Sequence, residues 1–343
     1  MNIDDFDYNL PQNLIADRRL LNRDESRLLL VSHDGFLKDE HFYNLSDYVK
    51  DDSLIIFNNS KVIKAYLSLF KGSEKIGINL NKPITNTIWS GFAKPAKKLQ
   101  IGDSFEFGDH KIIVKNKYDL GLVEFEFDLS GSVTIYDFLD MFGSTPIPPY
   151  IRGGVADDED EEDYQTIFSS QPGSVAAPTA GIHFSDHVFV QLQKKGVDFC
   201  FVTLHVGAGT YLPVKDSIEN HVMHSEFGEI SEEAANKINE AKKSGRNIIA
   251  VGTTSLRTIE HSALNDGIVH PGQFETDLFI KGGFAFKIAD QLITNFHMPK
   301  STLMVLVSSF AGYENIISAY NHGIKNNYRF LSYGDAMFLS RKR

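Results

Sequence analysis

The chain has 343 residues, 42% of them hydrophobic and 23% charged, a composition typical of a globular protein with two domains. No apolar run reaches the roughly 18 residues of a transmembrane helix and no signal peptide is visible, so we expect a cytoplasmic protein with no membrane partner. The single cysteine, Cys200, excludes an internal disulfide and a zinc site made of cysteines, while the formal net charge of −11 argues superficially against a nucleic-acid partner.

The first part of the chain favours β-strands. After the strand-like SRLLLV come LIIF, AYLSLF, TIWSGFA, DSFEFG, HKIIV and LVEFEF, between about Leu54 and Phe127, separated by short turns. Strands at this spacing predict a small barrel or sandwich. PIPPYIRGG, from Pro146 to Gly154, then breaks regular structure. We therefore assign residues 54–149 to an inserted β-barrel domain.

The second part alternates helices with apolar strands. Helices are predicted at 185–195, 231–244, 256–264, 301–310 and 314–325, and strands at 197–204, 247–251, 290–295 and 328–332. Continuous apolar strands between helices indicate a mostly parallel sheet covered on both faces. The expected fold is thus a layered α/β domain, residues 1–53 and 150–343, that carries the small β-barrel as an insertion.

Charge is distributed unevenly along the chain. Seven acidic residues form the run DDEDEED, Asp157 to Asp163, which we interpret as a solvated loop. Basic residues cluster elsewhere, and local patches can meet phosphates whatever the net charge. These clusters include Arg18, Arg19, Arg23 and Arg27, and the lysines Lys61, Lys64, Lys94, Lys97 and Lys98.

Several loops combine glycine, proline and histidine, a texture that indicates an enzyme because small residues let the backbone approach a ligand closely. They are QPGSVAAPTAGIHF (171–184), FVTLHVGAGTYLPV (201–214), HVMHSE (221–226), VGTTSLRTIE (251–260) and LITNFHMPKST (292–302). His183, His205 and His297 lie near predicted strand ends, where ligands gather in open α/β sheets. Each of them can also be an ordinary structural histidine.

VGTTSLRTIE reads as a strand, a tight turn and a helix start, where backbone amides with Thr254 and Ser255 favour an anion, unless the segment is a plain helix cap. Arg257 can bind a carboxylate bidentately or pair with Glu260. Asp277 can simply satisfy a turn. No Walker loop or GxGxxG pattern is present, so nicotinamide and flavin cofactors are unsupported.

HVMHSE contains two histidines and a glutamate that could look like metal ligands. Their spacing is not specific for a metal. We therefore predict no metal site.

These segments, in this order, closely resemble the S-adenosylmethionine:tRNA ribosyltransferase-isomerases of the queuosine pathway. The resemblance runs nearly end to end and is specific because the matching blocks are long. The blocks are DFDYNLP, RDESRLL, KPAKKL, PIPPYI, YQTIF, PGSVAAPTAGIHF, FVTLHVGAGTYLPV, HVMHSE, VGTTSLRT, TDLFI, LITNFHMPKSTL, FAG and YRFLSYGDAM. The resemblance implies an α/β domain with an inserted β-barrel, which agrees with the division made from the residues.

The resemblance also implies a reaction. The ribosyl moiety of S-adenosylmethionine is transferred to 7-aminomethyl-7-deazaguanine (preQ1) in tRNA and isomerised, which gives epoxyqueuosine-tRNA and releases adenine and methionine. S-adenosylmethionine is consumed as a cosubstrate, so no cofactor is expected. The implied partners are S-adenosylmethionine and the anticodon loop of a preQ1-containing tRNA, and we expect a monomer.

This chemistry suggests roles for the histidines. The sulfonium acidifies the 5′ carbon, so a base must remove a proton there, and a general acid helps adenine to leave. Histidines titrate in the useful range. We therefore assign His183 and His205 as the acid–base pair, with His297 in reserve.

The remaining assignments concern binding. Arg257 and the helix start at Thr254 and Ser255 are assigned to the methionine carboxylate. Asp277 is assigned to ribose hydroxyls and Phe184 to the sulfonium. The RNA phosphates are assigned to Lys61, Lys64, Lys94, Lys97 and Lys98.

Two other functions stay open. A methyltransferase that acts on RNA would release S-adenosylhomocysteine. A non-enzymatic RNA-binding module would show no turnover, and the loops rich in glycine, proline and histidine would serve no purpose in it. Fold alone does not separate these alternatives.

Overall fold

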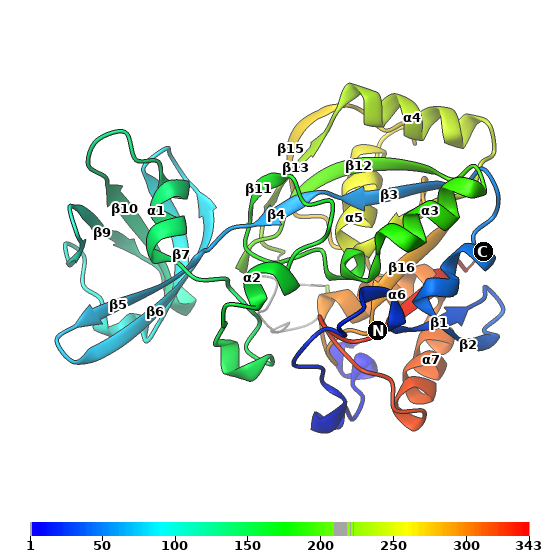
Figure 1. Ribbon diagram of the computed structural model, residues 1–343, viewed down its shortest axis with the longest axis horizontal. Coiled ribbons are helices and arrows are strands. Elements are labelled where there is room, and N and C mark those ends of the chain that lie inside the picture. Colours follow the sequence, from blue (N-terminus) through cyan, green and yellow to red (C-terminus); the bar gives the residue numbers. More distant parts are fainter. Residues whose placement is uncertain (1, 209–217, 220, 222, 343) are drawn as a thin grey trace.

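The computed structural model describes residues 2–208, 218, 219, 221 and 223–342. It divides the chain into a larger unit, which holds both ends of the described chain, and a smaller unit beside it (Figure 1). The larger unit is built on a nine-stranded sheet and the smaller one on a six-stranded sheet. The expected fold class, a layered α/β domain with a small barrel-like β domain, is confirmed.

The nine-stranded sheet is mixed. Its strands in spatial order are β15 (Gly272–Thr276), β13 (Glu226–Ile230), β12 (Asp198–His205), β3 (Leu54–Asn58), β14 (Ile248–Val251), β16 (Gln291–Asn295), β17 (Ala336–Ser340), β1 (Arg27–Val31) and β2 (Leu37–His41). The four central neighbours β12, β3, β14 and β16 are parallel, whereas the strands at both edges pair antiparallel. All side chains of β3 and β14 are buried, which explains why these strands are continuous apolar runs.

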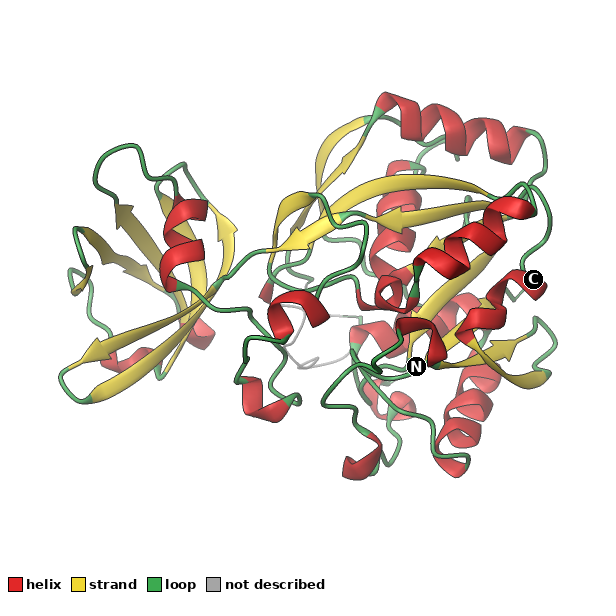
Figure 2. Ribbon diagram, viewed as in Figure 1, coloured by secondary structure: helices red, strands yellow, loops and turns green. Residues whose placement is uncertain are grey.

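Helices cover both faces of this sheet (Figure 2). Because successive strand residues point to opposite faces, Leu54 and Ile56 of β3 join one core and Ile55 and Phe57 join another. The helices of the first core are α4 (Glu232–Lys243), α5 (Gly252–Ser262), α6 (Thr302–Ala311) and α7 (Tyr313–Lys325). The second core is closed by α3 (Asp186–Lys194) and the 3-10 segment Phe42–Asp47. The result is a three-layer α/β/α unit.

The smaller unit is an antiparallel sheet that curls around its own apolar core (Figure 1). Its order is β5 (Tyr66–Lys71), β6 (Glu74–Pro83), β7 (Ile88–Lys94), β10 (Leu122–Asp128), β9 (His110–Lys117) and β8 (Ser104–Phe107). Helix α1 (Ile135–Phe142) closes the core through Phe138, whose ring lies 5.5 Å from that of Phe127.

One domain assignment and one strand assignment made from the sequence are wrong. Leu54–Asn58, expected to begin the inserted domain, is a strand but belongs to the large sheet as its central strand β3. The chain leaves that sheet through β4 (Ser60–Val62), which pairs with β11 (Gln171–Ser174), and a bridge between Tyr66 and Ser144 joins the two ends of the smaller unit. A short apolar run does not reveal to which sheet it belongs.

The second error concerns residues 328–332, expected to be a strand. Phe330 forms only an isolated bridge with Ile15, and Leu331 has a φ of 70°, which interrupts extended structure. The strand of this region is β17, which starts four residues later.

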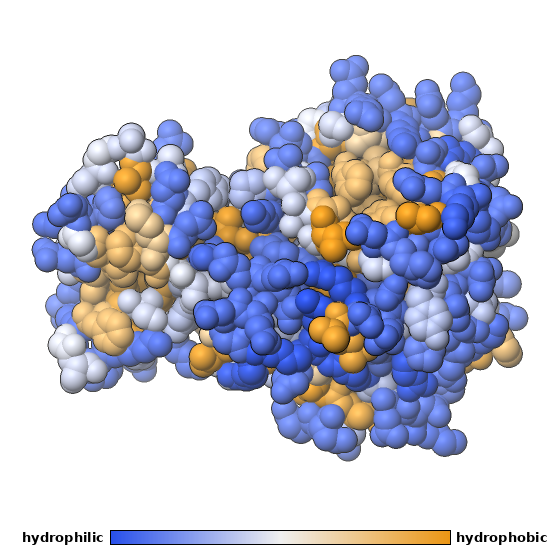
Figure 3. Space-filling model, viewed as in Figure 1, coloured by the Kyte–Doolittle hydropathy of each residue, from blue (hydrophilic) through white to orange (hydrophobic). Residues whose placement is uncertain are grey.

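The face of the molecule seen in Figure 3 is mainly hydrophilic, with separate apolar patches rather than one continuous surface. Within the described part of the chain, no helix combines the length and the apolar character needed to cross a bilayer.

Candidate functional site

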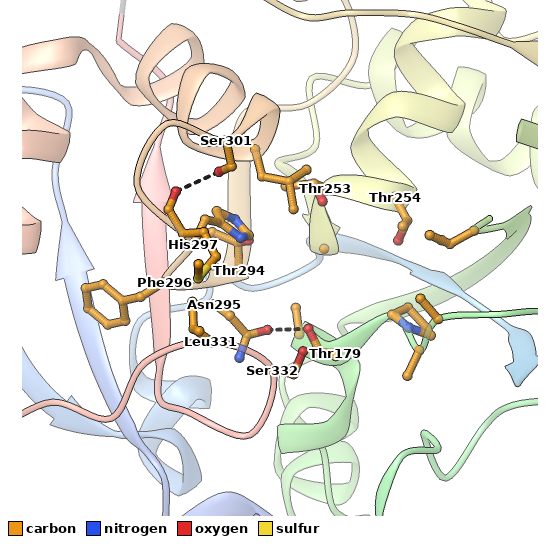
Figure 4. Close-up of a pocket in the computed structure, with 18 of the residues that line it drawn as sticks. Thr179, Thr253, Thr254, Thr294, Asn295, Phe296, His297, Ser301, Leu331 and Ser332 are labelled. Atoms are coloured by element: carbon orange, nitrogen blue, oxygen red, sulfur yellow. Dashed lines mark hydrogen bonds between the residues drawn. The ribbon is translucent and has the colours of Figure 1, made fainter. Parts of the chain in front are cut away.

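A cavity of about 430 Å³ lies at the carboxyl ends of β14 and β16. Ligands bind at this edge in parallel α/β sheets because loops and helix starts converge there. Figure 4 shows the side chains of several such segments around it. The lining residues come from four regions of the larger unit: Pro149, Tyr150 and Tyr164; Ala176 to Ala180 with Val206 and Glu226; Gly252 to Thr254 with Arg257; and Thr294 to Ser301 with Leu303, Leu331 and Ser332.

The start of α5 forms one wall. Gly252 has a φ of 84°, a conformation that favours glycine and lets the chain turn directly from β14 into the helix. The residue before this helix, Val251, makes no side-chain cap within the described chain, so the first amides can bind a ligand. The Thr254 hydroxyl is buried and has no partner among the described residues. By contrast, the Ser301 side chain caps α6. The start of α5 is therefore the better anion site.

Arg257, one helical turn further along α5, is buried in the same wall. Its Nη1 donates to the Glu226 carboxylate and its Nε donates to the Leu278 carbonyl at 3.0 Å. Its Nη2 is buried without a partner in the described chain. The predicted alternative, a pair with Glu260, is wrong because that carboxylate accepts backbone N–H groups of residues 287–289. Arg257 thus keeps one donor for a ligand.

His297 is the predicted catalytic histidine that lines the cavity. Its Nε2 lies 2.9 Å from the Thr294 hydroxyl, and its backbone N–H donates to the Tyr320 hydroxyl at 2.8 Å. Desolvation by the surrounding protein lowers the pKa of His297 to about 3. The imidazole is therefore neutral at neutral pH.

His183 does not line the cavity but contacts Asn295, which does. The Asn295 amide nitrogen donates to its Nε2 at 3.2 Å, so the proton on Nδ1 faces the Ser26 hydroxyl at 2.8 Å. Burial lowers the pKa of His183 to about 3, helped by Arg329 and Arg23. Asn295 in turn accepts from the Thr179 hydroxyl at 2.9 Å, a bond drawn in Figure 4. Because both ring nitrogens are occupied, His183 holds Asn295 in place and does not line the cavity.

His205 does not line the cavity either. Its ring stacks on Phe227 with centroids 5.9 Å apart, and a Cβ at Gly173 would lie 3.1 Å from the ring on the other side. The next residue, Val206, points into the cavity. Alternation along the strand therefore turns His205 away from the cavity. The structure brings His297 and Thr254 together but separates His205 from them. Residues 209–214 of the segment FVTLHVGAGTYLPV, which contains His205, lie outside the described residues.

Three of the expected binding residues have other surroundings. Phe184 is completely buried in the second core, edge-to-face with Phe42 and Phe57, and so cannot face a sulfonium. The Ser255 hydroxyl donates back to the Val251 carbonyl at 2.7 Å. Asp277 is exposed and lies outside the cavity lining. Sequence patterns place these residues near the site but do not say which side of an element they occupy.

The expected RNA-binding lysines are all exposed or partly exposed, but they differ in whether they form ion pairs. Lys61, Lys94 and Lys97 are exposed and have no ion pair within the described chain. Lys64 pairs with Glu161 and Lys98 pairs with Glu74. The first three are therefore the freer cations.

The acidic run is only in part the solvated loop that we expected, because five of its seven residues are exposed but Asp160 and Asp163 are buried. It contains α2 (Asp160–Asp163), and Asp160 is fully buried, where it accepts hydrogen bonds from Arg18, Arg152 and the Tyr333 hydroxyl. Arg19 pairs with Asp163. Tyr164, directly after α2, lines the cavity. Opposite charges distant in sequence thus fold the run into a support for the cavity wall.

Several cavity residues were missed by sequence reasoning, among them Tyr150, Thr179, Glu226 and Asn295. Thr179, Glu226 and Asn295 lie in the five glycine-, proline- and histidine-bearing segments, so the segments were informative although the chosen residues were not.

The three residues of HVMHSE that were considered as metal ligands contact different parts of the molecule. His221 contacts the Phe279 ring, His224 contacts the Phe92 ring, and Glu226 binds Arg257. In the part of the chain that the structure describes, no three His, Cys, Asp or Glu side chains form a metal-binding group.

Comparisons with known proteins agree with this architecture. The family described as queuosine biosynthesis protein matches residues 3–339. The S-adenosylmethionine:tRNA ribosyltransferase-isomerases of Rickettsia bellii and Rickettsia felis are 49% and 45% identical, with alignments that cover 100% of this chain and of each relative. A crystal structure of S-adenosylmethionine tRNA ribosyltransferase from Thermotoga maritima is 31% identical, with 97% of this chain and 99% of that chain covered and a TM-score of 0.55. The chain therefore belongs to the queuosine biosynthesis protein family.

Proposed function

We propose that this chain transfers the ribosyl moiety of S-adenosylmethionine to preQ1 in the anticodon loop of a tRNA and isomerises it, giving epoxyqueuosine-tRNA, adenine and methionine. The relatives from Rickettsia are named S-adenosylmethionine:tRNA ribosyltransferase-isomerase, and this enzymatic activity comes to the chain through full-length similarity. The base, the product and the released molecules are the finer part of the proposal.

The observation that carries the proposal is the pair of unused donors in the cavity wall. Thr254 Oγ1 and Arg257 Nη2 are buried without partners in the described chain, next to the uncapped start of α5. Buried polar groups are normally hydrogen-bonded, so such donors suit a ligand with a carboxylate. Small apolar residues such as Ala176 and Ala180 line the same cavity. An amphiphilic molecule with one carboxylate and a flat base, such as S-adenosylmethionine, fits this division.

A cationic sulfonium would require neutral or electron-rich surroundings. His297 supports this requirement because its low pKa keeps the ring uncharged, so it presents no repelling charge. Aromatic residues in the lining, Tyr150 and Tyr164, can face a cation in the role first given to Phe184. We assign His297 to contact with the reacting ribose and His183 to positioning Asn295.

Mass spectrometry of preQ1-bearing tRNA after incubation with S-adenosylmethionine tests the proposal. We expect the tRNA to gain the ribosyl-derived group while adenine and methionine appear in equal amounts. The product S-adenosylhomocysteine would instead identify a methyltransferase, and RNA binding without turnover would identify a binding module. A tRNA without preQ1 is the matched substrate control.

Two histidine variants sharpen the assignment. His297→Gln should lower the rate about a hundredfold, the usual contribution of a well-placed proton-transfer group. His187→Gln is the matched control because its side chain, 57% exposed, lies on α3. Equal rates for both variants would remove His297 from the reaction.

A further inference from the structure

A small hollow with a cationic lining lies beside the main cavity. It is lined by Arg19, Leu20, Arg23, Ser26, Ile182, His183, Arg329, Ser332, Tyr333 and Gly334, and no carboxylate is among these residues. Its volume is about 10 Å³, roughly the space of one oxygen-sized group. Ser332 lines both this hollow and the main cavity. A group bound here would therefore lie next to whatever occupies the cavity.

Arg23 and Arg329 stand out from the other arginines of the described chain. Seven of the nine described arginines have a carboxylate oxygen within 4.0 Å: Arg18, Arg19, Arg27, Arg152, Arg246, Arg257 and Arg341. Among the described residues, the Arg23 side chain donates to the carbonyls of Gln165 and Glu162, and the Arg329 side chain donates to the carbonyl of Arg18. The two arginines without a carboxylate thus line the same hollow.

Both guanidinium groups are partly buried, and the carboxylates that act on them from a distance, Asp163 and Glu162 for Arg23 and Asp335 and Asp17 for Arg329, form no ion pair with them within the described chain. Burial, and for Arg23 also the neighbouring Arg19, lowers the pKa of each group below its ordinary value. Holding two cations together away from bulk water is unfavourable unless an anion compensates them. Guanidinium groups bind phosphate oxygens through paired N–H donors, which makes phosphate a well-matched anion.

We propose that Arg23 and Arg329 bind a backbone phosphate of the RNA substrate at the wall of the cavity. The proposal rests on the proposed function, because a nucleotide whose base enters the cavity carries its own phosphates to the cavity rim. One non-bridging oxygen fills the hollow, and the rest of the phosphate stays outside it. This site differs from the lysines expected from the sequence to bind RNA, which are outside the cavity lining.

The test compares RNA binding by Arg23→Gln, Arg329→Gln and the double variant with that of the wild type, by fluorescence anisotropy at several KCl concentrations. An unmodified tRNA transcript serves as probe, so no turnover is needed. Each substitution should weaken binding about tenfold, and the double variant should flatten the slope of log K against log salt by about 0.7 to 0.9, the contribution of one phosphate. Lys243→Gln, at the exposed end of α4 and without an ion pair among the residues that the structure describes, should change neither quantity.

One result would support the proposal and two would overturn it. Thermal unfolding identifies variants that fold, and Arg23→Lys and Arg329→Lys, which keep the charge but lose the paired donors, should keep the salt slope while weakening binding. Wild-type affinity and slope in folded Gln variants would overturn it. So would weaker binding of S-adenosylmethionine in calorimetry with RNA binding unchanged, because the anion would then be the cosubstrate carboxylate. Failure of the proposed function appears separately, as a wild-type enzyme that binds tRNA but forms no product.

Discussion

The two units of the molecule differ in how completely their buried polar atoms are satisfied. Six buried side-chain atoms in the described chain have no hydrogen-bond partner, and all belong to residues outside the six-stranded sheet: Ser60, Thr166, His205, Thr254, Arg257 and Ser308. The core of the smaller unit is instead filled with apolar side chains such as Phe125 and Phe138. Because unsatisfied buried groups are rare, their concentration in the larger unit indicates that ligand chemistry belongs there. The smaller unit contributes shape and exposed charge.

The largest expected effect tests the polar wall of the larger unit. Arg257→Leu leaves the buried Glu226 carboxylate without its guanidinium and should lower the free energy of unfolding by about 3 to 5 kcal/mol. It should also lower turnover at least tenfold through loss of the unused donor. Urea unfolding and product formation measure the two effects.

The double variant Arg257→Leu/Glu226→Leu separates stability from function. It removes both charges, so most of the lost stability should return while turnover stays low. Recovery of turnover together with stability would mean that Arg257 only supports the fold.

The next prediction concerns the acidic run that supports the cavity. Asp160→Asn removes a buried charge that compensates Arg18 and Arg152, and it should destabilise the protein by about 3 kcal/mol. Asp158→Asn, two residues earlier, changes an exposed residue without an ion pair in the described chain and should stay within about 0.5 kcal/mol of the wild type. If the two variants were equally stable in urea unfolding, the run would have to be interpreted as a solvated loop.

A smaller, pH-dependent effect follows from the buried histidines. The pKa of His183 is lowered from 6.5 to about 3 on folding, so between these values the unfolded chain binds a proton that the folded chain does not. Stability therefore falls as the pH is lowered through this window, by about 1.4 kcal/mol per pH unit for each such histidine. His183→Gln should make the decline between pH 6 and pH 4 shallower by about this amount, whereas the exposed His187→Gln should not. An unchanged slope in the His183 variant would contradict the low pKa.

The sequence predicted the elements that depend on local pattern. The central strands and most helices were found because burial on both faces requires continuous apolar runs and because caps mark helix ends, as Ser231 does for α4. The edge strands β13 and β15 were missed because they alternate or are largely exposed, which gives them no apolar run. β13 depends on pairing with β12, and β15 depends on pairing with β13, contacts that no local window contains.

The site residues show the same difference between features set by local sequence and features set by tertiary contacts. Thr254, Arg257 and His297 were predicted from helix-start and strand-end positions, which are local signals. The partner of Arg257 was not predicted because Glu226 lies 31 residues away, on another strand. The choice of Phe184 failed for a related reason, since only tertiary packing decides that Phe184 faces a core.

The smallest expected effect tests the smaller unit. Lys94→Gln/Lys97→Gln removes two exposed cations without ion pairs in the described chain, so RNA binding should weaken a few-fold and the salt slope should fall by about 1.4 to 1.8. Lys98→Gln should do less, because Glu74 already partly neutralises that charge. Filter binding at several salt concentrations measures both. Affinity for S-adenosylmethionine should not change in either variant, since these lysines lie on a unit whose buried polar groups are satisfied. A change in that affinity would show that the two units share the ligand site and would break the division between them.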